Sequence, residues 1–126
     1  MSMDVVDLRN FYDSGPGLVA RRLLRRRLRA MWPDVGAFSV MGLGYATPYL
    51  RLFQAEAVRV FAVMPAQLGV LRWPSDEPNA VTICDETLLP LPDRSVDRAI
   101  LIHAIEHSEA LHPMLREVWR VLTDDG

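Results

Sequence analysis

Hydrophobic residues follow two different spacings along the chain, and the two spacings predict alternating helices and strands. Apolar positions at helical spacing, or signals for the start of a helix, predict helices at residues 4–12, 18–32, 48–57 and 110–122. One more short helix is expected from Ala66. Continuous apolar runs that are too short for helices predict four buried strands, at residues 38–41, 59–64, 80–84 and 96–102.

Buried strands that alternate with helices indicate a parallel sheet covered by helices on both faces. The expected fold class is therefore α/β, a doubly wound parallel sheet preceded by N-terminal helices. A chain of 126 residues is one domain by size. We expect a helical segment at residues 1–36 and a sheet-containing core at residues 37–126. Ligands of such sheets bind beyond the carboxyl ends of the strands, so the residues after each strand are the candidates for function.

Composition narrows the class of protein. Half of the residues are hydrophobic, and the net charge of -2 argues against a dedicated nucleic-acid binder. No run of about 20 apolar residues predicts a membrane span, and no apolar signal-peptide core follows the N-terminus, so the cytoplasm is the expected location. The single cysteine, Cys84, excludes an internal disulfide and a multi-cysteine zinc site.

Arginines are concentrated in the helix predicted at residues 18–32, which has two interpretations. An anionic partner would fit them, such as RNA, a phospholipid surface or an acidic protein. Alternatively, the helix is solvated and its arginines pair with the acidic C-terminal half of the chain. No aromatic residues alternate with the arginines, which weakens the case for nucleic acid.

Two short segments that follow predicted strands could bind a ligand. The first strand leads into G-L-G-Y-A-T at residues 42–47, where glycines allow a sharp turn and a close approach of a ligand to the backbone. Because the later glycine of a dinucleotide motif is missing, this segment also fits a tight turn without a ligand. Asp85 and Glu86 follow the third strand. A carboxylate there could accept a hydrogen bond from an exocyclic amine, or could simply cap a turn.

The last third of the chain carries longer motifs. From residue 85 it follows the pattern D-x-x-x-L-P-x-x-D-x-S-F-D, with valine in place of the phenylalanine. The pattern is carried by Asp85, Leu89, Pro90, Asp93, Ser95, Val96 and Asp97. Residues 105–107 are similar to the L-E-H that follows a fourth strand, and residues 115–122 to the L-x-E-x-x-R-V-L of a helix and its exit turn. These motifs resemble the class I S-adenosylmethionine-dependent methyltransferases, especially a bacterial branch of them.

The resemblance implies a Rossmann-like sheet with the strand order three-two-one-four, to which complete members add three further strands. It implies S-adenosylmethionine as cofactor, S-adenosylhomocysteine as product, no metal, and a methyl acceptor that the sequence does not identify. His103 is the one candidate for a general base. The cofactor-binding residues that the resemblance implies are Gly42, Gly44, Tyr45, Ala46, Met64, Asp85, Glu86 and His103.

Two positions depart from the family pattern. Gly42 stands where the family has an acid near the methionine part of the cofactor, and Met64 stands where an acid takes the ribose hydroxyls. Asp85, on the adenine side, is kept. The sequence therefore predicts a methyltransferase or its cofactor-binding half, inactive on its own. The alternatives are a non-catalytic methyltransferase-like interaction module and, more remotely, a dinucleotide-binding oxidoreductase, which Met64 and the broken glycine motif disfavour.

Two further features bear on metal binding and assembly. Residues 103–107 match the H-x-x-E-H zinc motif of some metalloproteases. We expect no zinc there, because His103 should end a strand and no distal glutamate ligand is identifiable. The fourth strand would leave an unpaired hydrophobic edge in a sheet truncated after it. That edge predicts either a sequence that ends early or a homodimer that covers the edge.

Overall fold

A parallel sheet forms the centre of the molecule. The computed structural model describes residues 4–65, 81–106 and 108–126, and within them the sheet has four strands. They are β1 (Ser39–Gly44), β2 (Arg59–Pro65), β3 (Val81–Cys84) and β4 (Arg98–Ile102). Their order across the sheet is β3-β2-β1-β4, and each neighbouring pair is parallel. The predicted α/β class and strand order are both confirmed.

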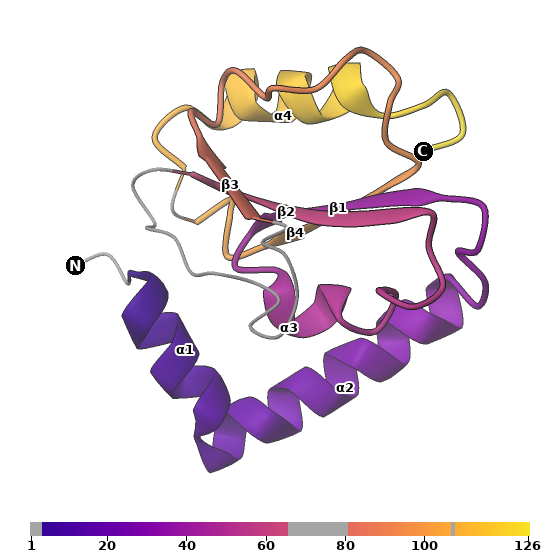
Figure 1. The fold of residues 1–126 in the computed structure, drawn as a ribbon. Helices are drawn as coiled ribbons and strands as arrows, with labels where there is room; N and C mark the ends of the chain where they lie inside the picture. The colour runs from indigo at the N-terminus through magenta and orange to yellow at the C-terminus, as the bar shows by residue number, and fades with distance from the viewer. Residues whose placement is uncertain (1–3, 66–80, 107) are drawn as a thin grey trace.

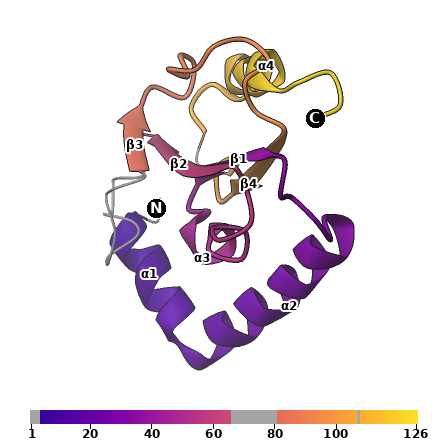
Figure 2. The same cartoon turned by 45° about the vertical axis from the view of Figure 1, so that its right-hand side comes forward.

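Helices cover both faces of this sheet. They are α1 (Val5–Asp13), α2 (Gly15–Met31), α3 (Thr47–Leu50) and α4 (Leu111–Val121). Figure 1 shows α4 on one face and the other three helices on the opposite face, an arrangement that the turned view of Figure 2 repeats. None of the helices in the described ranges is long and apolar enough to cross a membrane. The short helix predicted from Ala66 lies outside the described residues.

The two N-terminal helices begin at capping residues. The Asp4 carboxylate accepts hydrogen bonds from the backbone N–H groups of Val6 and Asp7, and the Asp7 side chain accepts one from the Asp4 N–H, which completes a capping box. Ser14 caps α2 by accepting from the Gly17 N–H. The second helix therefore begins at Gly15, three residues before the predicted start.

The helix predicted at residues 48–57 is wrong in its length. It ends at Leu50, and residues 51–56 continue as turns. The N–H groups of Leu52 and Phe53 bond to carbonyls three residues back, which tightens the chain beyond α-helical geometry. This tighter path places the buried Phe53 ring against Trp32, with ring centroids 5.8 Å apart.

Gly42 does not begin a turn, as the sequence suggested, but lies inside β1. Its backbone pairs with Ala62 on β2 and Ile100 on β4. A β-carbon at Gly42 would lie 2.6 Å from the side chains of Ala46 and Leu50. Glycine is therefore needed at this position for the close packing of α3 on the strand.

The predicted start of the fourth strand at residue 96 is also too early. The strand begins at Arg98, while Val96 forms an isolated parallel bridge with Leu122, the residue that follows α4. The Val96 N–H donates to the Val121 carbonyl, and its carbonyl accepts from the Thr123 N–H. The entry to β4 is therefore tied to the exit from α4.

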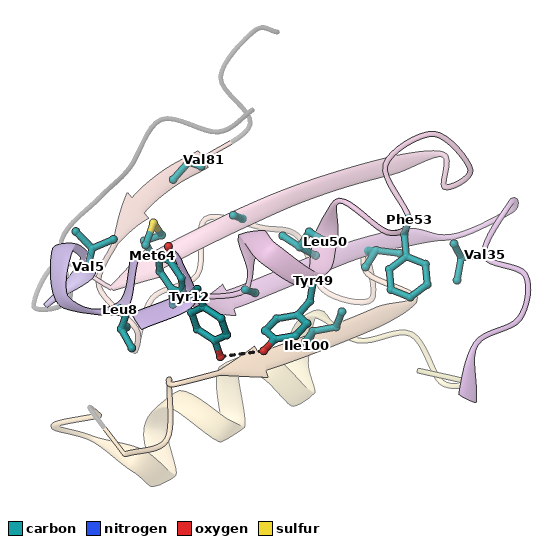
Figure 3. Packing of buried hydrophobic residues seen from close by; sticks show 14 residues of the cluster. Val5, Leu8, Tyr12, Val35, Tyr49, Leu50, Phe53, Met64, Val81 and Ile100 are labelled. Atoms are coloured by element: carbon teal, nitrogen blue, oxygen red, sulfur yellow. Dashed lines mark hydrogen bonds between the residues drawn. The ribbon is translucent and has the colours of Figure 1, made fainter. Parts of the chain in front are cut away.

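Two apolar clusters fill the space between the sheet and the helices. Figure 3 shows the cluster on the α3 side, in which Val5, Leu8 and Tyr12 of α1 pack near Met64 at one end. The other cluster lies under α4 and contains Met114 and Val118.

Two side chains of α4 hold the loop between β3 and β4 in place. Glu117 accepts from the Leu89 N–H at 2.9 Å. The Arg120 guanidinium donates to the carbonyls of Leu89 and Leu91, to the Asp93 carboxylate at 2.7 Å, and to Glu117 at 2.7 Å. The hydrogen bonds from Arg120, and secondarily the one from Leu89, hold the pKa of Glu117 below its ordinary value of 4.5.

Acidification is expected to weaken the fold through Glu117. Because its pKa is lower in the folded than in the unfolded chain, ionised Glu117 stabilises the fold above about pH 4.5, and this stabilisation disappears as the pH falls through the lowered pKa. Urea unfolding between about pH 6 and about pH 3 should show a smaller loss of stability for Glu117→Gln than for the unchanged protein. Glu109→Gln, at an exposed glutamate, should follow the unchanged protein. Identical pH dependence of all three proteins would contradict the assignment.

Candidate functional site

The carboxyl ends of β1 and β4 meet at a glycine that no other residue could replace without strain. Gly44 has a φ of 89°, in the left-handed region. A β-carbon there would lie 2.3 Å from the Ile102 carbonyl oxygen, which itself accepts from the Tyr45 N–H at 2.8 Å. The first strand continues past its predicted end at residue 41, so Gly44 is its last residue and the turn begins there. The turn brings the backbone of two strand ends into direct contact.

A tyrosine from α1 lies at this same end of the sheet. The Tyr12 hydroxyl is 3.1 Å from His103 Nε2, and the Tyr49 hydroxyl donates to Tyr12 at 2.9 Å. The Tyr12 ring also stacks on Tyr45, with centroids 5.6 Å apart and an interplanar angle of 19°. Figure 3 shows Tyr12 and Tyr49 joined by their hydroxyl groups. Burial raises the pKa of Tyr49, so its hydroxyl keeps its proton.

His103 follows β4 and is held from two sides. Its Nδ1 lies 2.9 Å from a carboxylate oxygen of Glu106, and its backbone has a φ of 55°, unusual for a residue with a side chain. The His103 ring is therefore within hydrogen-bond distance of Glu106 at one nitrogen and of Tyr12 at the other. Glu106, His103 and Tyr12 thus form a continuous hydrogen-bonded chain. His107, the last residue of the H-x-x-E-H pattern, lies outside the described residues.

Met64 and Ala46 are core residues at the edge of this site. Both are completely buried in the cluster that also contains Val5 and Leu8 of α1. Met64 lies one residue before the end of β2, so an apolar side chain occupies the position where the family has its ribose-binding acid. Among the described residues, the end of β2 therefore offers no carboxylate.

The two acids after β3 point in different directions. Asp85 is exposed and accepts from both the backbone N–H and the hydroxyl of Thr87, at 2.8 and 2.7 Å. These two hydrogen bonds lower the pKa of Asp85, which stays ionised. Glu86 is 4% exposed and accepts from the Glu109 N–H at 3.0 Å. Its second oxygen has no hydrogen-bond partner within the described residues.

The predicted site residues therefore separate into three groups. Gly44, Tyr45 and His103 come together at the ends of β1 and β4. Asp85 lies exposed at the end of β3, which β2 separates from β1. The others pack in the interior: Gly42, Ala46, Met64 and Glu86. Sequence analysis missed Tyr12 and Tyr49, although Val5, Leu8 and Tyr12 share one helix face by their spacing.

Comparisons with known proteins place the chain in a family. The family model described as a methyltransferase domain matches residues 34–126, more than half of the chain. A crystal structure of a protein from Anabaena variabilis ATCC 29413, assigned as a methyltransferase from an antibiotic biosynthesis pathway, is similar with 28% sequence identity and a TM-score of 0.52. That likeness covers 80% of this chain and 42% of the Anabaena chain, so this chain spans less than half of that relative.

No curated protein matches the sequence. The matched residues include β1 and β4, whose carboxyl ends meet at Gly44, the segment with Asp85, and the loop between β3 and β4. The family model, the solved relative and the strand order all support the methyltransferase resemblance that the motifs in the last third of the sequence indicated. The chain therefore belongs to the class I S-adenosylmethionine-dependent methyltransferase family.

Proposed function

We propose that this chain is the cofactor-binding half of a methyltransferase and that it binds S-adenosylmethionine and S-adenosylhomocysteine. The observation that carries the proposal is the Gly44 turn, where the backbone bends at the carboxyl ends of β1 and β4. Ligands of open α/β sheets bind at this edge, where the order of the strands reverses direction. The strand order β3-β2-β1-β4 puts that reversal between β1 and β4.

The residues at this edge fit part of the cofactor. Gly44 is buried, and because it has no side chain the Ile102 carbonyl packs directly against it, which shapes the turn at this edge. The exposed Asp85 carboxylate could accept from the adenine amine. Tyr45 and His103 would flank the methionine part. When bound, the cofactor supplies a methyl group on a positively charged sulfur, and these residues would bind and orient it. Met64 does not fit the ribose hydroxyls, so we expect weaker binding than a complete site would give.

Calorimetry tests the assignment of Asp85. We expect S-adenosylhomocysteine to bind, and Asp85→Ala to raise its Kd about 10- to 100-fold, because a hydrogen bond to a charged group contributes about 1.5–3 kcal/mol. Asp125→Ala is the matched control, since this exposed aspartate lies near the amino end of β4, where its backbone carbonyl accepts from Arg98. An equal loss of affinity in both variants would contradict the adenine contact.

A second candidate is a non-catalytic module that has lost its cofactor. It is favoured by the buried Met64 at the end of β2 and by Tyr12, which lies against His103 at the strand ends. The same calorimetry distinguishes the two. No heat with either methionine-based ligand at millimolar concentration would favour the module, while tighter binding of NAD would instead favour the oxidoreductase alternative.

A further inference from the structure

The outer flank of α2 carries a groove that the cofactor site does not use. It has a volume of about 410 Å³ and opens beside the residues that follow α3. We call it the arginine groove, and its lining residues are Leu18, Arg21, Arg22, Arg25, Arg26, Arg29 and Leu52. Figure 2 shows α2 on the outside of the molecule, along the side away from α4.

Positive charge in the arginine groove is largely uncompensated. Arg29 pairs with Glu56 at 3.0 Å. Within the described part of the chain, no carboxylate pairs with the other four arginines. The carboxylates of the acidic C-terminal half that form ion pairs pair with Arg94, His103 and Arg120. The alternative in which the arginines of α2 pair with the acidic C-terminal half is therefore wrong for these four arginines.

The arginines of this groove lie close to one another and to Arg51. Burial lowers the pKa of the Arg25 guanidinium from its ordinary value, and the neighbouring charges of Arg21 and Arg51 lower it further. Like charges held together without a counter-charge attract anions. An anion that entered the groove would relieve this repulsion.

Large apolar side chains are exposed beside these arginines. Val19 and Leu23 are 54% and 55% exposed, and Leu18 is 40% exposed. Val19, Arg22, Leu23 and Arg26 are spaced so that they share one face of α2. One helix face therefore presents guanidinium groups and aliphatic side chains together.

We propose that the arginine groove docks α2 onto an anionic phospholipid surface. Guanidinium groups bind phosphate with two parallel hydrogen bonds, and a basic helix with exposed aliphatic residues lies in the interface between headgroups and acyl chains. A nucleic acid would use the charges but would leave Val19 and Leu23 in water, and α2 has no aromatic ring on which a base could stack. This inference does not depend on cofactor binding.

Sedimentation with vesicles tests the proposal. The full chain should bind vesicles of phosphatidylcholine and phosphatidylglycerol, and should not bind phosphatidylcholine alone. Arg22→Gln/Arg26→Gln should weaken that binding roughly 25-fold, because each arginine near an anionic surface contributes roughly fivefold. The control is Arg94→Gln/Arg116→Gln, which removes the same charge from exposed arginines outside the groove and should bind unchanged.

A second variant separates docking from simple charge attraction. Leu23→Ser keeps every charge and changes an exposed residue, so the fold should be unaffected, as circular dichroism would check. It should weaken vesicle binding most clearly at high salt, where electrostatic attraction is screened. Equal binding to both vesicle types, equal loss in the control pair, or binding of single-stranded RNA or inorganic polyphosphate without binding of vesicles would each overturn the proposal.

Discussion

Gly44→Ala should lower the free energy of unfolding by about 3 kcal/mol or more, because two separate costs add at one position. The backbone at Gly44 has a φ of 89°, which strains any residue with a β-carbon. The added carbon would also lie 2.3 Å from the Ile102 carbonyl oxygen. That oxygen belongs to the backbone and accepts from the Tyr45 N–H, so it cannot move without breaking the hydrogen bond between the two strand ends.

Urea unfolding measures this effect, and Gly15→Ala is its matched control. A β-carbon at Gly15, the first residue of α2, would meet no atom within 4 Å. We expect the control to change stability by no more than about 1 kcal/mol, in the direction of greater stability, because alanine reduces the freedom of the unfolded chain. A Gly44→Ala protein as stable as this control would show that the turn can relax into another conformation. The S-adenosylhomocysteine affinity of any folded fraction should also fall.

The helices and strands were largely predictable because their signals are local. Periodic or continuous apolar positions depend only on neighbouring residues, and they located α1, α2, α4 and all four strands. The strand order followed from the family resemblance. The helix predicted at residues 48–57 was too long because, after Leu50, the N–H groups of Leu52 and Phe53 bond to carbonyls three residues back, whereas in an α-helix they would bond four residues back. Nothing in the local sequence distinguishes these two patterns of bonding.

The residues of the candidate site were predictable only where they lie at the ends of strands. Gly44, Asp85 and His103 each follow or end a strand, so their edge of the sheet could be inferred from the sequence. The contact between Tyr12 and His103 joins residues 91 positions apart and depends on where α1 docks. Glu86 turns inward because the Glu109 N–H lies nearby, which again depends on a distant segment. These contacts depend on tertiary packing, which the spacing of residues along the sequence does not predict.

Arg120→Ala should lower the free energy of unfolding by about 2–3 kcal/mol, because this side chain is the main link between α4 and the loop that joins β3 to β4. Its loss would remove the donors to the Leu89 and Leu91 carbonyls and leave Glu117 without its cation. Arg120→Lys should recover little of that stability, since an ammonium group cannot reach several acceptors in the fixed geometry of a guanidinium.

The neighbouring Arg116→Ala provides the control on the same helix. Arg116 is exposed and has no ion pair within the described residues, so the change should stay within about 0.5 kcal/mol. Comparing urea midpoints of the three variants separates the role of the network from the loss of one positive charge. Since the same loop begins at Asp85, Arg120→Ala should also weaken S-adenosylhomocysteine binding, even though Arg120 lies away from the strand ends. Loss of stability with unchanged affinity would mean that Thr87 alone orients Asp85.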